Sequence, residues 1–366
     1  MQIRTLSPDL SICDQPRPED MARIASLGLR HHRVVVVGGG SAGIATTASL
    51  LKRRKGLDIA VVEPREEHYY QPGWTMVGGG VFKPRDTVRP TGKIMPKGAQ
   101  WIHAGCIGFD PDRKAILLDD GTRLTYEVLI VAMGNRLAWE AVDGLEAALG
   151  QFGVTSNYRY DLAPYTWELV RATRGGRALF TQPPMPIKCA GAPQKAMYLS
   201  CSEWRRSGAL GGIEVEFHNA GTALFGVADY VPALMEAVQG YGIDLRFGSN
   251  LVAVDGPARE ATFRTAEGEV PRRFDMLHAV PPRKRPMRLL PPVRSQMPAG
   301  MRKLIPRHCA TRAIRRSLHW AMVATPPMRR LPQPRASRPP SWRSTHWRFS
   351  TARRRLPATT VMARAR

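Results

Sequence analysis

The sequence predicts an α/β fold with two three-layer, Rossmann-like nucleotide-binding domains. A β-branched run at residues 33–37 leads through closely spaced glycines into a helical segment at 41–54 and a second apolar strand at 58–63. Further along, strands at 178–181 and 213–218 alternate with helices at 194–206 and 228–239. Such alternation is typical of parallel sheets that are covered by helices.

These patterns divide the chain into four segments. Residues 1–30 form a leader that is too short to fold alone; it resembles the opening of a small phosphatase-like domain, and the alternative is an ordinary disordered or packed leader. Residues 31–145 hold the first nucleotide-binding domain, with a hairpin at 110–122 and a buried strand at 128–132. Residues 146–282 hold the second domain, inserted in the first, and residues 283–366 form an Arg- and Pro-rich tail that we expect to be disordered.

The positive charge of the chain is concentrated in this tail. The formal net charge is +24, yet residues 283–366 contain 20 Arg, 2 Lys and neither Asp nor Glu. The first 282 residues therefore carry 32 basic and 30 acidic residues and are nearly neutral. A uniformly basic protein would favour nucleic acid or anionic lipid as a partner, but this distribution predicts no specific nucleic acid.

Cysteine usage and hydropathy limit the class of protein further. Five scattered cysteines form neither a disulfide framework nor a metal-binding cluster, so we expect a reducing compartment and no metal. The sequence has no signal-peptide pattern and no run of eighteen apolar residues. We therefore expect a cytoplasmic protein, without a transmembrane segment, whose membrane contact is peripheral, at the inner membrane.

A glycine turn after the first strand predicts a dinucleotide site. Gly38, Gly40 and Gly43 form the pattern G-x-G-x-x-G between a buried strand and a helix, where a pyrophosphate can approach the backbone and the helix N-terminus. Glu63 ends the next strand, twenty residues after Gly43, where its carboxylate can accept hydrogen bonds from an adenosine ribose. The alternative is a glycine-rich turn without a ligand.

A second glycine turn helps to choose the cofactor. The buried strand that ends at Ala132, Met133 and Gly134 resembles the shorter signature of flavoproteins that bind two dinucleotides. This resemblance favours FAD over NAD at the first site, although an ordinary strand before a turn would give the same pattern. The expected cofactor contacts come from both turns and the segment after the second strand: Gly38, Gly40, Ser41, Ala42, Gly43, Glu63, Pro64, Gln71, Ala132, Met133 and Gly134.

Two longer blocks resemble one enzyme family. Residues 63–64, 68–75 and 77–80 (EP, HYYQPGWT and VGGG) are similar to the flavin-proximal stretch of sulfide:quinone oxidoreductases. Residues 186–199 (PIKCAGAPQKAMYL) are similar to the block that carries the first redox cysteine of that family. With the glycine turns, the resemblance covers residues 32–282.

The resemblance implies a chemistry. In this family two cysteines beside the FAD form a disulfide or sulfur-bridged pair, sulfide attacks it, and two electrons pass through the flavin to quinone. Cys189 matches the sulfur-accepting residue, and Lys188 and Lys195 match positions near the substrate. Lys188 and the following helix N-terminus could stabilise a thiolate. Without the block around it, Cys189 would be read as a small buried hydrophobe.

The remaining candidates have structural interpretations. We expect Cys106 and Cys201 to be packing cysteines, and His103, His218 and His278 to be structural histidines, because none has a partner at metal-ligand spacing. Tyr69, Trp74 and Phe82 could line a quinone or flavin pocket or could belong to the core. Both interpretations, pocket lining and core packing, stay open for these residues.

The acid-free tail is consistent with a shifted reading frame. When codons are read from the third base of each present codon, residues 314–342 permit a peptide that resembles the Gly-Asp signature with which the family binds FAD. The last residues likewise permit a peptide that resembles the block of the second redox cysteine. We therefore expect a chain that lacks these elements and the family's C-terminal membrane anchor, and whose activity is impaired. A basic arm for nucleic acid or anionic lipid is the alternative explanation of the tail.

The sequence thus predicts an FAD-dependent enzyme with sulfide and quinone as substrates. The alternatives are a flavoprotein that reduces quinone or a disulfide with NAD(P)H, and an inactive remnant that binds no flavin.

Overall fold

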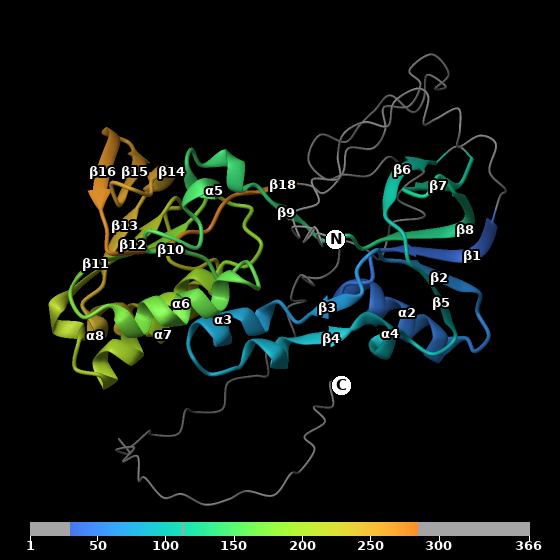
Figure 1. The fold of residues 1–366 in the computed structure, drawn as a ribbon, viewed down its shortest axis with the longest axis horizontal. Coiled ribbons are helices and arrows are strands. Elements are labelled where there is room, and N and C mark those ends of the chain that lie inside the picture. Colours follow the sequence, from blue (N-terminus) through green and yellow to red (C-terminus); the bar gives the residue numbers. More distant parts are fainter. Residues whose placement is uncertain (1–29, 112, 285–366) are drawn as a thin grey trace, which may run out of the picture. The chain divides into compact units, whose positions relative to one another are not determined.

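The computed structural model describes residues 30–111 and 113–284 (Figure 1). Within this range the α/β class predicted from the sequence is confirmed. Residues 1–29 of the predicted leader, nearly the whole tail and both frame-shifted blocks lie outside the described residues.

A six-stranded sheet forms the centre of the first domain. Its order is β5 (Ala99–Ile102), β2 (Ile59–Val62), β1 (Arg30–Val37), β8 (Arg123–Val131), β7 (Ala115–Leu118) and β6 (Cys106–Asp110). The first four strands run parallel, and a hairpin of β6 and β7, which starts four residues before the predicted one at 110–122, adds two strands paired in the antiparallel sense. Residues 34–37 and all of β2 are buried, as continuous apolar runs predict for strands covered on both faces.

Helix α2 (Ser41–Arg53) follows β1 directly and connects it to β2. The other short elements of this domain lie between β2 and β5: β3 (Glu67–Tyr69), α3 (Pro72–Gly78), the 3₁₀ turn η1 (Pro84–Thr87), β4 (Val88–Pro90) and α4 (Thr91–Ile94). Strands β3 and β4 pair with each other to form a small hairpin. From this hairpin, α3 reaches the second domain, where it packs on α6 (Leu162–Ala172) and α7 (Gly191–Arg206).

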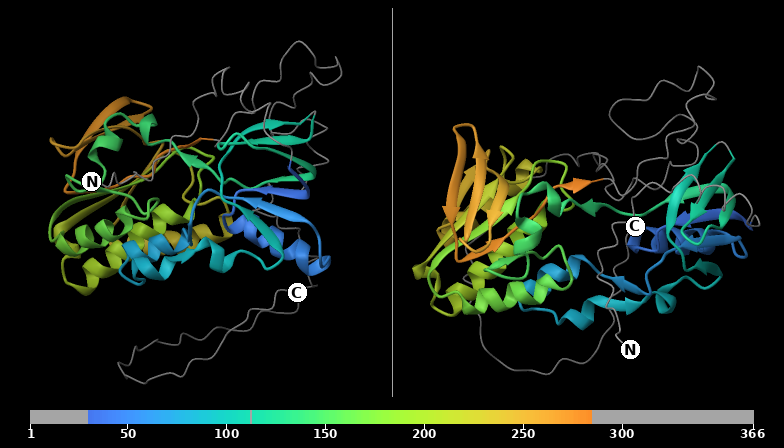
Figure 2. Two further views of the ribbon diagram at one scale, coloured as in Figure 1. Left: turned by 45° about the vertical axis from the view of Figure 1, so that its right-hand side comes forward. Right: turned by 45° about the horizontal axis from the view of Figure 1, so that its top comes forward.

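The second domain is a five-stranded parallel sheet with one helical layer. Its order is β10 (Val154–Thr155), β17 (Met276–His278), β11 (Gly176–Gln182), β12 (Ile213–Asn219) and β13 (Asp244–Phe247). Helices α6, α7 and α8 (Val231–Tyr241) lie on one side of this sheet (Figure 1). The antiparallel strands β14 (Asn250–Asp255), β15 (Glu260–Thr265) and β16 (Gly268–Arg273) lie on the other side (Figure 2).

Two adjacent segments connect the domains. Strand β9 (Arg136–Leu137) pairs with β18 (Arg283–Lys284), and the amide of Ala138 donates to the carbonyl of Pro282 at 2.8 Å. Between β9 and β10 lie the 3₁₀ turn η2 (Trp139–Ala141) and helix α5 (Leu145–Ala148). Two further 3₁₀ turns, η3 (Leu210–Gly212) and η4 (Ala228–Tyr230), precede β12 and α8. The chain therefore enters and leaves the second domain along one ladder.

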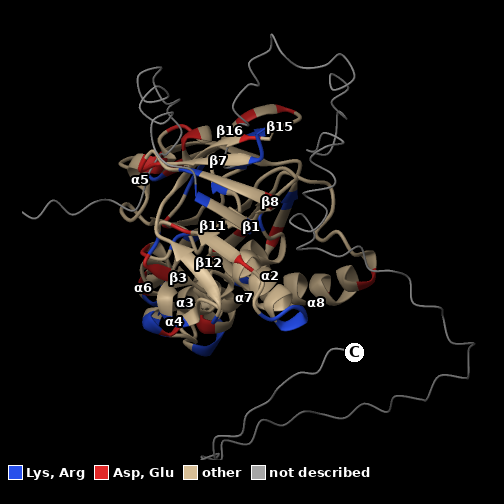
Figure 3. Cartoon of the chain, turned by 90° about the vertical axis from the view of Figure 1, so that its right-hand side faces the viewer, with Lys and Arg blue, Asp and Glu red and all other residues tan. Residues whose placement is uncertain are grey.

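Acidic and basic residues are interspersed along the described elements (Figure 3). The excess of basic residues comes from the acid-free tail, of which the structure describes only the first two residues. No helix within the described residues is both long enough and apolar enough to span a bilayer.

Candidate functional site

The predicted dinucleotide turn brings the two glycine segments into contact. Gly38 has a φ of +102°, and a Cβ built on it would lie 2.6 Å from the carbonyl oxygen of Ala132 and 2.9 Å from the amide nitrogen of Met133. A Cβ on Gly43 would lie 1.9 Å from the carbonyl oxygen of Gly38. Close backbone approach therefore requires glycine at both positions.

The same turn leaves backbone accessible where a phosphate could approach. A Cβ built on Gly40 or Gly134 would meet no heavy atom within 4 Å. Ser41, Ala42 and Gly43 form the first turn of α2, whose amides have no intrahelical partner, and no acidic residue lies in that turn. An open backbone, a helix N-terminus and the absence of negative charge fit a bound pyrophosphate.

Glu63 already has backbone partners. Its Oε2 accepts a hydrogen bond from the amide of Gly39 at 2.8 Å, and its Oε1 accepts one from the amide of Arg65 at 2.9 Å. Each carboxylate oxygen can accept a second hydrogen bond, so the group can still receive ribose hydroxyls. Pro64 contributes its carbonyl to His103, whose Nε2 donates to it at 2.6 Å.

The segment that follows β2 reaches both predicted sites. His68, on β3, has its Nδ1 3.3 Å from the carbonyl oxygen of Gly39 in the glycine turn. Three residues later, the side-chain oxygen of Gln71 accepts a hydrogen bond from Nζ of Lys188. A cofactor-binding candidate and a substrate-proximal candidate, 117 residues apart in sequence, are thus in direct contact.

Cys189 lies two residues before α7, and it is exposed and free. Its carbonyl oxygen accepts hydrogen bonds from the hydroxyl of Tyr158 at 2.8 Å and from the amide of Ala192 at 3.3 Å. Lys195 is exposed on the first turns of α7, and its Cε lies 3.8 Å from a Cβ built on Gly191. Among the described residues, the Cys189 sulfhydryl forms no hydrogen bond with the glycine turn.

Lys188 lies in an aromatic environment. Its Nζ lies 5.7 Å from the ring centroid of Trp74 and 5.9 Å from that of Tyr158. Burial lowers the pKa of Lys188 to about 8; the neighbouring Cys189 opposes this shift and Arg65 adds to it. Near neutral pH the ammonium form predominates, with aromatic faces and one amide oxygen around it.

Sequence reasoning missed Tyr158 and Arg65. Neither lies in a recognised block, and Tyr158 reaches Cys189 only because β10 and the start of α7 lie at the same edge of the parallel sheet. Trp74 is buried and packs with Tyr69 and Tyr160, so its core interpretation holds, whereas Phe82 is exposed.

The other cysteines and histidines have structural environments. Burial raises the pKa of Cys106 and of Cys201 to about 12. His278 is fully buried; its Nε2 accepts the amide of Asn157 at 2.9 Å, and burial lowers its pKa to about 4. No group of three or more His, Cys, Asp or Glu side chains is arranged to hold a metal ion within the described residues.

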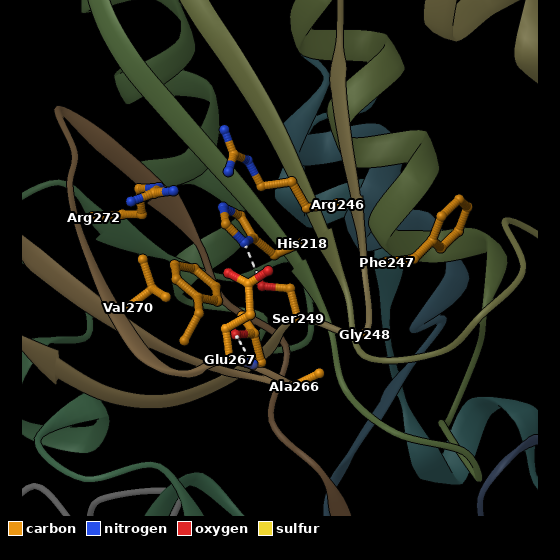
Figure 4. A pocket seen from close by; sticks show the side chains of 11 residues that line it. His218, Arg246, Phe247, Gly248, Ser249, Ala266, Glu267, Val270 and Arg272 are labelled. Carbon is orange, nitrogen blue, oxygen red and sulfur yellow. Dashed lines mark hydrogen bonds between the residues drawn. The ribbon is translucent and has the colours of Figure 1, made fainter.

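A cavity of about 380 Å³ lies elsewhere in the second domain (Figure 4). His218, in its wall, contacts Ser249 Oγ at 2.8 Å and the buried Glu216 at 3.0 Å. Burial opposes ionisation of Glu216, but His218, Arg246 and Arg177 hold the pKa of this carboxyl below its ordinary value. This ion network links β12 and β13 to the β14–β16 sheet and includes none of the predicted site residues.

Comparison with known families supports the sequence interpretation. Residues 32–166 match the model of the pyridine nucleotide-disulphide oxidoreductase family. The mitochondrial sulfide:quinone oxidoreductase of Dictyostelium discoideum is 39% identical over 231 residues, which are 63% of this chain and 51% of that protein. The enzyme of the same name from Mus musculus is 38% identical over 247 residues, or 66% of this chain and 54% of that protein.

Solved structures show the same fold. A sulfide:quinone oxidoreductase from Aquifex aeolicus superposes with a TM-score of 0.59 at 20% identity, covering 69% of this chain and 58% of that one. The chain spans about half the length of the curated relatives it matches. The predicted resemblance to sulfide:quinone oxidoreductases is thereby confirmed, and the matched family model and relatives are oxidoreductases by name.

Proposed function

We propose that the chain is an FAD-dependent oxidoreductase of the sulfide:quinone oxidoreductase type, with sulfide as electron donor and quinone as acceptor. One observation carries the proposal. Gln71, in the block similar to the flavin-proximal stretch, contacts Lys188, which precedes Cys189 in the block similar to the redox-cysteine stretch. Two separately recognised blocks therefore meet through side chains.

In this proposal the glycine turn holds the cofactor. The backbone at Gly40 and the first amides of α2 bind the pyrophosphate, Glu63 binds the ribose, and Gly134 lies beside the second turn. When bound, FAD supplies a two-electron acceptor that quinone reoxidises. Pro64, Gln71, Ala132 and Met133 remain proposed contacts of the same cofactor.

Cys189 accepts the sulfur in this proposal. Attack of hydrosulfide on a disulfide or bridged pair that joins Cys189 to the second redox cysteine, which we expect in the shifted frame, would break one S–S bond and form another, leaving a persulfide on one cysteine and a thiolate on the other. The exposed position of Cys189 allows sulfide to enter, and the Lys188 ammonium and the start of α7 lie on either side of this residue in the chain.

The activity of the chain as written is a separate proposal. The second redox cysteine and the Gly-Asp contact of the family are expected only in the shifted frame of residues 283–366. We therefore propose weak FAD binding and slow turnover. Peripheral membrane contact and a cytoplasmic location at the inner membrane stay predictions; the matched relatives are named mitochondrial.

Flavin absorbance before and after addition of sulfide tests the function. We expect the chain restored to the shifted frame and reconstituted with FAD to be bleached by sulfide and to recover its colour with a soluble quinone, and the chain as written to be bleached slowly at most. Cys189→Ser should retain the yellow colour but lose the bleaching, while Cys201→Ser, a substitution in the core, serves as the matched control. Bleaching by NADH instead of sulfide would favour the NAD(P)H-dependent alternative, and a colourless protein would favour the remnant.

A further inference from the structure

Tyr158 contacts both the backbone of Cys189, the proposed sulfur acceptor, and the side chain of Lys188. It is almost completely buried, at 6% exposure, and lies just after β10. Its hydroxyl donates to the carbonyl oxygen of Cys189 at 2.8 Å, and its ring lies 5.9 Å from Nζ of Lys188. One side chain thus contacts the backbone of the cysteine and the cation of the preceding residue.

The hydroxyl contact constrains a short irregular segment. Residues 183–190 run from the end of β11 to the start of α7 without regular structure, and Met185 in this segment is 68% exposed. The Cys189 carbonyl is held by the Tyr158 hydroxyl and the Ala192 amide, and only the Tyr158 bond comes from outside this segment and the helix. The bond therefore fixes the peptide that carries the sulfur against the edge of the parallel sheet.

The contact with the Tyr158 ring positions the Lys188 ammonium group. Lys188 has Trp74 on a second side at 5.7 Å, and Gln71 accepts its hydrogen bond. A cation over an aromatic face is attracted to the ring without being neutralised by a counter-ion, so its charge stays available to the neighbouring sulfur. The charged or titratable groups that act on Lys188 are Cys189 and Arg65, and the phenol of Tyr158 contacts it through the ring.

We propose that Tyr158 is a positioning residue for the Cys189 sulfur, which it holds near the Lys188 ammonium by binding the Cys189 carbonyl and supporting the cation on its ring. The inference rests on the proposed function, in which Cys189 accepts sulfur. Its physical content, a cation held at a fixed place beside a thiol, can be measured without flavin or sulfide.

The test compares alkylation of Cys189 by an anionic and a neutral reagent. Iodoacetate and iodoacetamide react with the full-length chain, and mass spectrometry of the peptide that contains Cys189 gives the two rates. A nearby cation raises the iodoacetate-to-iodoacetamide ratio, so Lys188→Gln should lower it about fivefold. In the unmutated chain the ratio should also fall as the pH rises past about 8, where Lys188 loses its proton.

Tyr158→Phe is the decisive variant because it keeps the ring and removes only the hydroxyl. We expect the ratio to fall at least about twofold and its dependence on pH to flatten, since the sulfur is no longer held beside the cation. Tyr165→Phe is the matched control; the Tyr165 hydroxyl accepts the amide of Gly153 at 3.3 Å and does not contact Cys189. The control should leave the ratio unchanged.

Two results would overturn the inference: an unchanged ratio in Tyr158→Phe, or an equal fall in Tyr165→Phe. If Tyr158→Phe does not fold, Tyr158→Gln is measured instead, which keeps a donor but removes the ring under Lys188; an unchanged ratio there also overturns it. A chain that shows the expected ratios but is not bleached by sulfide would refute the proposed function alone.

Discussion

The three glycines of the dinucleotide turn are required for different reasons. Gly38 and Gly43 are fixed by the protein itself, because a Cβ on either would overlap backbone atoms. Gly40 is different, since a Cβ there meets nothing within 4 Å. The empty space at Gly40 is where the proposed pyrophosphate approaches, so glycine is needed there for the ligand and not for the fold.

Alanine substitutions distinguish the glycines that the fold requires from the glycine that the proposed ligand requires. We expect Gly43→Ala to lower both the melting temperature and FAD affinity, because the methyl group would lie 1.9 Å from the Gly38 carbonyl oxygen. Gly40→Ala should leave the melting temperature of the flavin-free chain unchanged while weakening FAD at least about tenfold, or about 1.4 kcal/mol. Gly240→Ala, in α8 with no neighbour within 4 Å, is the control. Unchanged FAD affinity in Gly40→Ala would argue against the site.

Lys188 makes stability depend on pH in a known direction. Its pKa is about 8 in the folded chain and 10.5 when unperturbed, so between these values the unfolded state binds more protons. The contribution of this group to stability therefore rises as the pH increases from about 8 to 10.5, by roughly 2 kcal/mol after allowance for partial exposure.

Replacing Lys188 by methionine should remove this dependence. Lys188→Met should be more stable than the unmutated chain near neutral pH, and its advantage should shrink as the pH rises past about 8. Urea unfolding at several pH values measures the difference. Lys97→Met, at an exposed position, should show no such trend. A constant difference across the pH range would show that Lys188 is not desolvated as the structure indicates.

At the scale of elements, α3 links the segment after β2, which contains Gln71, to α7, which follows Cys189. A Cβ on Gly78 would lie 2.1 Å from Oδ1 of Asn157, and one on Gly79 would lie 2.6 Å from Cδ1 of Leu199 in α7. Gly80 has a φ of +71°, and a Cβ there would lie 2.4 Å from the Trp167 ring of α6. The run of three glycines thus lets α3 pack closely on α6 and α7.

Gly78→Ala tests this packing. The new methyl group would overlap the buried Asn157 side chain, so we expect a loss of about 1–3 kcal/mol and a fall of several degrees in melting temperature. Because Gln71 lies just before α3, the alkylation ratio of Cys189 should fall as well. Gly211→Ala, at a position without neighbours within 4 Å, should change neither quantity. Normal stability and reactivity in Gly78→Ala would contradict the proposed link.

For the molecule as a whole, the sequence predicted the alternating strands and helices of the parallel sheets. It missed the elements that are stabilised mainly by tertiary contacts. The run from Val34 to Val37 signals a buried parallel strand by composition alone. Helix α3 has four glycines in or just after it and is poor in helix formers, so its packing on α6 and α7 is what stabilises it. Strands β14–β16 were missed, although Ala261 and Phe263 of β15 are buried at a two-residue spacing.

The candidate site residues also fall into two groups, those within a sequence motif and those outside one. Gly38, Gly43 and Cys189 could be predicted as site residues because a motif contains each of them, and the structure shows the close approach that the two glycines allow. Tyr158 lies 31 residues from Cys189 and in no motif, so only the parallel pairing of β10 with β17 and β11 with β17 brings it there. Contacts made across a sheet edge leave no periodicity in the sequence.

The acid-free segment gives the last prediction, which concerns the whole chain. If residues 283–366 are read out of frame, a gene restored to the shifted frame should encode the Gly-Asp and second-cysteine blocks, and its product should retain FAD through gel filtration at close to one flavin per chain. The chain as written should retain much less, since residues 30–284 supply the glycine turns alone. The restored chain with Gly43→Ala is the control, because it should lose the flavin again. Equal retention by the two chains would contradict the shifted frame, and salt-sensitive DNA binding by residues 283–366 would favour a basic arm instead.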